Sequence, residues 1–207
     1  MISRRSAIAA LTIGFLTSHA AIGLCADNTG ASQTPDGLIH QLGADAVHML
    51  ADNSRTEQQR EAEFRRLFDS GFDLDTISRL VLGRFWREAT DAQKQEFRSL
   101  FETYVVKSYV VRLGHYDGET FKVGAARSGE DGDAMVQSEI DRPNGPPIKV
   151  EWRTRKEAGG YRIVDVAVDG VSMMQTQREE FATVIQNGGG KVDALLARLR
   201  QQTTTKG

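Results

Sequence analysis

The sequence predicts an α+β fold, in which a meander of about four antiparallel strands lies between N-terminal and C-terminal helices. Apolar residues recur at helical spacing from Leu38 to Val111, alternate with a period of two from Phe121 to Val168, and return to helical spacing after Ser172. Helices that precede and follow a run of short strands are typical of α+β domains, whereas parallel sheets need helices between the strands.

Residues 1–26 have the composition of a cleavable secretory signal peptide. Arg4 and Arg5 are followed by a short apolar run, then by small residues up to Ala26, and no acidic residue occurs before Asp27. The apolar run is too short for a transmembrane helix. We therefore expect export to the periplasm, with residues 27–33 as a polar linker.

The remaining chain has the length and composition of one globular domain. The whole sequence of 207 residues is 40% hydrophobic and 26% charged, with a formal net charge of −2. This charge gives no sign of a nucleic-acid partner. We expect a monomeric domain over residues 34–201 and a disordered tail over 202–207.

Helix-capping residues divide the N-terminal half into four helices. Thr34 precedes a proline and caps the first helix. Capping boxes at Thr56–Gln59 and Thr90–Gln93 open the second helix and a long fourth helix. Between them, Gly71 ends the second helix and 73–83 forms a short apolar one.

The strands follow, and they are separated by turn signals. Glycine-containing turns at 143–145 and 158–160 punctuate alternating segments, which are Phe121–Ala125, Ala134–Ile140, Ile148–Thr154 and Tyr161–Val168. One curved sheet with helices on a single face would leave a cavity between the layers. A flat and closed two-layer sandwich fits the same pattern.

The search for catalytic and metal-binding motifs finds little. The chain has one cysteine, which excludes a thiolate metal site, and its four histidines show no helical metal-binding pair. No phosphate-binding loop occurs, so we expect neither a metal nor a cofactor. His115, Tyr116 and Asp117 could form a polar site, but a turn that ends the long helix explains them more simply.

Two residues near the last strand have the character of catalytic groups. Ser172 follows the strand, but a nucleophile elbow needs a second glycine where Met174 stands, and no histidine follows. Ser172 is therefore expected to cap the next helix. Asp165 lies in an apolar strand, where it is either a buried general base or an acid paired with Arg153 or Arg162.

Several segments together resemble the MlaC family of toluene-tolerance auxiliary proteins. The similarity covers roughly residues 38–200, and its segments are Leu80–Gln93, Tyr116–Phe121, Asp141–Pro147, Trp152, Tyr161–Val166 and Gly170–Met173. Trp86, Trp152 and Thr176–Arg178 resemble the hopanoid-associated HpnM branch in particular. Some relatives carry an arginine after the turn glycine, where this chain has Pro146.

The resemblance implies an NTF2-like sheet, wrapped by helices around an apolar cavity that holds the acyl chains of a lipid. It also implies a periplasmic carrier of phospholipid or of a hopanoid-related lipid. Its expected partners are an outer-membrane lipoprotein complex and an inner-membrane ABC transporter complex.

A carrier needs a deep apolar lining rather than a polar motif. The candidates for this lining are Val81, Leu82, Phe85, Trp86, Phe97, Phe101, Tyr104, Tyr109, Phe121, Val136, Ile140, Val150, Trp152, Ile163, Met173, Met174, Phe181 and Ile185. For each one alone, ordinary core packing is an equally good explanation. The methionines are the strongest candidates, because their flexible side chains adapt to an irregular ligand.

Three hypotheses follow. The first is lipid carriage without catalysis. The second is an NTF2-like enzyme that uses Asp165, or Tyr116 and Asp117, on a small hydrophobic substrate. The third is an interaction module with a solid core.

Overall fold

The computed structural model describes residues 34–112 and 117–204. The predicted signal peptide and linker, together with His115 and Tyr116, lie outside the described residues. The elements, in chain order, are α1 (Pro35–Ala51), α2 (Glu57–Gly71), α3 (Leu74–Leu82), α4 (Phe85–Glu88), α5 (Asp91–Arg112), β1 (Thr120–Ser128), η1 (Glu130–Gly132), β2 (Ala134–Asp141), β3 (Ile148–Glu157), β4 (Gly160–Val168), β5 (Val171–Ser172), α6 (Met173–Asn187) and α7 (Val192–Thr204).

The caps predicted from the sequence start the helices. Thr34 Oγ1 accepts a hydrogen bond from Gly37 N at the start of α1. The side chains of Thr56 and Gln59 exchange hydrogen bonds with each other's backbone N–H, and Thr90 with Gln93 does the same before α5. These local contacts explain why the helix starts could be predicted.

The strands form one antiparallel sheet in the order β1-β2-β3-β4-β5. The four predicted strands are confirmed, and the two-residue β5 adds a short fifth strand at the edge. It follows a tight turn through Asp169 and Gly170, both of which have positive φ. Glycine adopts this conformation without steric cost, which lets the chain reverse and enter α6.

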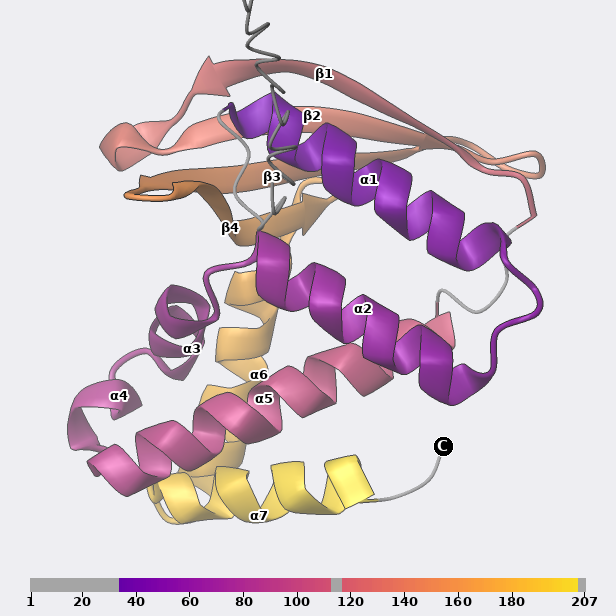
Figure 1. Ribbon diagram of the computed structural model, residues 1–207. Coiled ribbons are helices and arrows are strands. Elements are labelled where there is room, and N and C mark those ends of the chain that lie inside the picture. Colours follow the sequence, from indigo (N-terminus) through magenta and orange to yellow (C-terminus); the bar gives the residue numbers. More distant parts are fainter. Residues whose placement is uncertain (1–33, 113–116, 205–207) are drawn as a thin grey trace, which may run out of the picture.

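The two faces of the sheet differ in chemistry. Directly paired residues share a face, so Val123, Ser138, Val150 and Val168 lie in one row, with Val136, Trp152 and Val166 in the next. This mostly apolar face, called the inner face below, is the one that α1 covers (Figure 1). The opposite, outer face carries mainly charged side chains.

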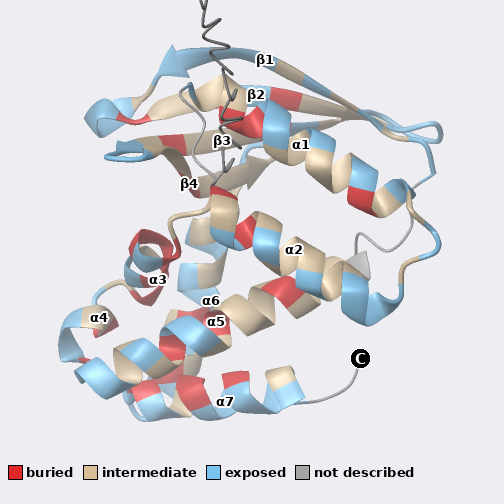
Figure 2. Ribbon diagram, viewed as in Figure 1, coloured by how far each residue is buried: buried red, intermediate tan, exposed pale blue. Residues whose placement is uncertain are grey.

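Helices pack beyond one edge of the sheet rather than across all of it. In Figure 1 the helices α3, α5, α6 and α7 lie beyond the β4 edge, while α1 lies across the sheet and α2 lies between the two groups. Buried residues are concentrated where the helices of the first group face one another (Figure 2). Within the described residues, no helix combines the length and apolarity needed to cross a membrane.

The C-terminal helix is longer than expected. α7 continues to Thr204, three residues beyond the predicted end of the domain at 201. Lys107 on α5 donates a hydrogen bond to the carbonyl of Thr203, which satisfies a free carbonyl at this helix end. A contact across 96 residues could not be read from the local sequence.

Candidate functional site

The buried apolar residues form two separate clusters. The sheet cluster joins the inner face to α1 and the end of α2, and consists of Leu38, Ile39, Leu42, Phe72, Phe121, Val123, Val136, Trp152, Tyr161, Ile163 and Val166. The helical cluster fills the space among α2, α3, α4, α5, α6 and α7. Phe72 packs against both clusters.

The centre of the helical cluster is densely packed. Phe97 stacks on Phe101 with ring centroids 5.6 Å apart, and Phe181 meets the Phe97 ring edge-on at 5.9 Å. Phe97, Ile185 and Leu195 have no exposed surface. These three side chains are packed on all sides, whereas Trp86, Tyr104 and Met174 of the same cluster are half-buried.

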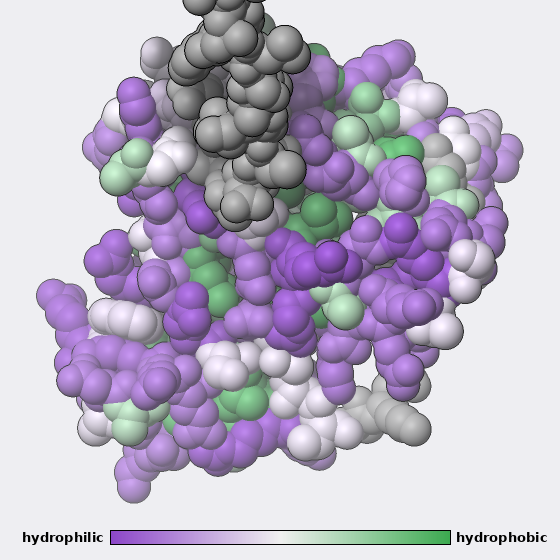
Figure 3. All heavy atoms as spheres, viewed as in Figure 1, coloured by the Kyte–Doolittle hydropathy of each residue, from purple (hydrophilic) through white to green (hydrophobic). Residues whose placement is uncertain are grey.

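The sheet cluster is buried at some positions and partly exposed at others. Val136 and Ile163 are fully buried, whereas Phe121, Val123 and Trp152 are only half-buried. Figure 3 shows hydrophobic residues set back between the hydrophilic residues of α1 and α2. A partly exposed apolar surface inside the fold is suited to a flexible hydrocarbon ligand.

Two polar side chains of the inner face already have hydrogen-bond partners. Trp152 Nε1 donates to Ser138 Oγ at 2.8 Å, and Thr154 Oγ1 donates to the carbonyl of Ala134 at 3.0 Å. Among the described residues, the buried side-chain atoms without a hydrogen bond are Ser78 Oγ on α3 and Arg153 Nε on the outer face. An acyl chain beside Trp152 and Thr154 would therefore leave neither of these donors unsatisfied.

The structure divides the predicted lining residues among the clusters. Ten belong to the helical cluster, and these are Val81, Leu82, Phe85, Trp86, Phe97, Phe101, Tyr104, Met174, Phe181 and Ile185. Four belong to the sheet cluster, and these are Phe121, Val136, Trp152 and Ile163. Ile140 and Val150 lie on the inner face outside the cluster, and Tyr109 and Met173 are half-buried on α5 and α6. Direct contact with a lipid stays a prediction for all eighteen.

Several members of the sheet cluster were absent from the predicted lining. Val123 and Val166 follow the same alternation as Phe121 and Trp152, so the period-two pattern could have found them. Leu38 and Leu42 lie at helical spacing on α1, but no local pattern in the sequence shows that this side of the helix covers the sheet. Phe72 lies between two helices, where no periodic pattern marks it.

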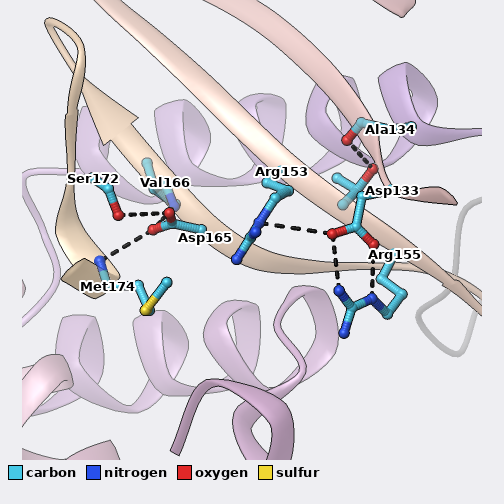
Figure 4. A network of polar contacts seen from close by, with 9 residues as sticks. Asp133, Ala134, Arg153, Arg155, Asp165, Val166, Ser172 and Met174 are labelled. Atoms are coloured by element: carbon cyan, nitrogen blue, oxygen red, sulfur yellow. Dashed lines mark hydrogen bonds and ion pairs between the residues drawn. The ribbon is translucent and has the colours of Figure 1, made fainter. Parts of the chain in front are cut away.

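Charged residues hold the outer face together. Arg155 donates two hydrogen bonds to Asp133, at 2.7 and 2.9 Å, and Asp133 is only 4% exposed (Figure 4). This contact raises the pKa of Arg155 above its ordinary value. Arg153 Nε lies 3.8 Å from the same carboxylate, too far for a hydrogen bond.

Asp165 has neither of the partners expected for it. Its carboxylate accepts hydrogen bonds from Ser172 Oγ at 2.6 Å, Val166 N at 2.8 Å and Met174 N at 3.1 Å (Figure 4). The predicted pairing with Arg153 or Arg162 is wrong, because Arg153 lies beside Asp133 and Arg162 donates to the carbonyls of α2. Ser172 also caps α6 by accepting from Gln175 N at 3.0 Å, which confirms its predicted role.

A one-residue bulge puts Asp165 on the outer face. Strict alternation would place Ile163 and Asp165 on the same side, yet the register shifts between them, so Thr154 pairs with Ile163 and Arg153 pairs with Asp165. Ile163 therefore enters the sheet cluster while Asp165 points away from it. A general base in the apolar site, one of the two readings open from the sequence, is wrong for this residue.

The acids whose pKa is raised also lie outside the apolar site. Burial raises the pKa of Asp69, and the carboxylate of Glu102 raises it further. Burial and the neighbouring Asp73 raise the pKa of Glu157 in the same way. Neither residue belongs to the sheet cluster. Within the described residues, no three acidic, histidine or cysteine side chains are grouped to hold a metal ion.

Comparison with known proteins agrees with this architecture. A family model described as MlaC protein matches residues 40–201. The toluene tolerance protein ttg2D of Pseudomonas putida is 25% identical over 191 residues, which cover 90% of this chain and 87% of that protein. The intermembrane phospholipid transport system binding protein MlaC of Haemophilus influenzae is 21% identical over 185 residues, covering 85% and 86%.

A solved structure has the same fold. The phospholipid-binding protein of Ralstonia solanacearum, determined in complex with a phospholipid, superposes with a TM-score of 0.71. The match covers 84% of this chain and 97% of that one, at 22% identity. The curved antiparallel sheet and its helices are therefore an arrangement already seen in another protein.

Proposed function

The chain belongs to the MlaC family, and from this premise we propose that it is a periplasmic lipid carrier whose inner sheet face holds the acyl chains of one lipid. The observation that carries the proposal is the inner face itself. It is mostly apolar, its aromatic residues Phe121 and Trp152 are half-buried, and the side chains of Trp152 and Thr154 have hydrogen-bond partners.

The energetics of transfer explain why such a face is needed. Each methylene moved from water to an apolar site contributes about 0.8 kcal/mol. Two acyl chains with about thirty methylenes would therefore cost on the order of 24 kcal/mol to expose to water. A carrier must shelter both chains, whereas the polar head group can stay in water.

The direction of lipid transport depends on the partner complexes rather than on the carrier alone. We propose that the protein exchanges lipid with an outer-membrane lipoprotein complex and an inner-membrane ABC transporter complex. Support comes from the Haemophilus relative, which is named as the binding protein of an intermembrane phospholipid transport system. The composition of residues 1–26 supports export.

The proposal is tested by identifying what the protein carries. The full chain is expressed with export, purified without detergent from the periplasmic fraction, and analysed by native mass spectrometry and lipid extraction. We expect bound phospholipid. A hopanoid-related lipid would support the carrier function with a different cargo, and a protein without any lipid would contradict it.

A matched pair of variants tests the location of the lipid. Val166 and Ala167 are adjacent and half-buried, but Val166 faces inward and Ala167 faces outward. A lysine at the inner position puts a charge where the acyl chains would lie, so Val166→Lys is expected to carry at least about tenfold less lipid. Ala167→Lys is expected to carry as much as the wild type. Circular dichroism checks that both variants fold. Equal amounts of bound lipid in both would refute an inner-face site.

A further inference from the structure

Two aromatic rings of the sheet cluster meet across the inner face. Phe121 on β1 and Trp152 on β3 are edge-to-face, with centroids 6.5 Å apart and planes at 88°. Ser138 on β2 lies between the two strands and accepts the hydrogen bond from Trp152 Nε1. The small serine side chain leaves room for the indole, and its hydroxyl fixes the indole's position.

The helix α1 also lies close against the Phe121 ring. A Cβ atom added at Gly43 would lie 2.2 Å from both Cδ1 and Cε1 of Phe121, so only glycine allows this approach. Glycine inside a helix is unfavourable relative to alanine, yet it occupies the middle of α1 at this contact. The Phe121 ring therefore contacts both α1 and Trp152.

The position of α1 itself is fixed. Leu38 and Ile39 are 3% and 1% exposed and anchor the helix in the sheet cluster. A side chain at position 43 would therefore displace the Phe121 ring more readily than it would lift α1. Both rings remain half-buried, so they border the open part of the inner face.

We propose that Gly43, Phe121 and Trp152 determine the length of acyl chain that the inner face accepts. The inference rests on the proposed lipid-carrier function. The aromatic pair lies across the inner face from β1 to β3, and Gly43 sets how closely α1 approaches it. Because each sheltered methylene changes affinity by about fourfold, a small displacement of the ring changes which chain length binds best.

Two substitutions with opposite expected effects test the proposal. Lipid-free protein is titrated with phosphatidylglycerols whose saturated chains run from twelve to eighteen carbons, and Trp152 fluorescence reports binding. Phe121→Ala removes one ring from the inner face and leaves more space there, so its preferred chain is expected to be at least two carbons longer than that of the wild type. Gly43→Ala pushes the ring inward, so its affinity for the longest chains is expected to fall about tenfold or more.

Matched controls separate this effect from general damage. Phe64→Ala removes a half-buried phenylalanine from the helical cluster, and His40→Ala changes an exposed residue of α1. Both are expected to keep the wild-type preference. If Gly43→Ala does not fold, Trp152→Phe is tested in its place. Binding is then followed by the fluorescence of Trp86. This variant keeps an aromatic ring but loses the hydrogen bond to Ser138, and its preference is expected to broaden.

The outcomes distinguish the two proposals. A wild-type protein that binds none of the lipids contradicts the carrier function. A wild-type protein that binds them, with the same chain-length preference in Phe121→Ala and Gly43→Ala, overturns only the role of the aromatic pair. A shift of equal size in Phe64→Ala also overturns it.

Discussion

At the scale of single residues, the connection from β4 to α6 shows how one carboxylate can organise a chain reversal. Asp165 accepts from two backbone N–H groups and one hydroxyl, and that hydroxyl in turn caps α6. Each of the four hydrogen bonds lies within ten residues of sequence. The group is therefore a local structural device, and it faces away from the apolar site.

Replacement of Asp165 measures this role. Asp165→Ala leaves three donors without their acceptor, so we expect the free energy of unfolding to fall by about 1–3 kcal/mol. Asp165→Asn keeps an oxygen for the two N–H groups and is expected to lose less. Urea unfolding gives both values. Lipid content is expected to stay at the wild-type level in both variants, and a folded Asp165→Asn protein without function would instead revive a catalytic role.

At the scale of elements, the helix ends depend on a few residues with special backbone geometry. α3 ends at Gly83, which has φ of 59° and ψ of −128°. Residues other than glycine are strongly disfavoured in this region of backbone conformation. The chain then turns directly into α4, whose Phe85 enters the helical cluster.

Gly83→Ala is therefore expected to lower the free energy of unfolding by about 1–3 kcal/mol. An added Cβ would lie 2.8 Å from Arg178 Nε, but this contact involves a flexible side chain that can move. The backbone cost should remain when Arg178 is truncated. Thermal unfolding of Gly83→Ala alone and combined with Arg178→Ala tests this, and full recovery in the double variant would identify the clash as the cause instead.

At the scale of the whole molecule, two apolar clusters are joined at a narrow connection. Phe72 packs against both, its ring lies 4.6 Å from that of Phe68, and its backbone pairs with Ile163. The next residue, Asp73, donates its N–H to the Ile163 carbonyl at 2.9 Å. This segment therefore joins the sheet to the helices, in addition to the contact of α6 with β4 through Asp165 and Met174.

The two tryptophans report on the two clusters separately, since Trp86 packs in the helical cluster and Trp152 in the sheet cluster. Single-tryptophan proteins made by Trp86→Phe and Trp152→Phe are expected to share one urea midpoint. Phe72→Ala is expected to lower stability by about 3 kcal/mol and to separate the two midpoints.

Phe64→Ala is the matched control for this separation, because Phe64 packs only against the helical cluster. It is expected to lower stability while keeping a single midpoint. Coincident midpoints in Phe72→Ala would show that other contacts couple the clusters.

The helices and strands could be predicted because their signals are local. The capping boxes at Thr56 and Thr90 lie within four residues, and the alternation of each strand lies within ten. The apolar site could be predicted only in part. A sequence shows which residues are apolar but not which of them pack in a core. Residues of the helical cluster and of the inner face were therefore predicted together as cavity lining.

By itself the sequence determined the order of the helices and strands, the cap at Ser172 and the family to which the chain is similar. Only the tertiary structure decided which side of the sheet each residue faces, because a bulge in β4 reverses the alternation between Ile163 and Asp165. It also decided that α1 approaches Phe121 at Gly43. Both depend on contacts between segments far apart in the chain, for which the local pattern carries no information.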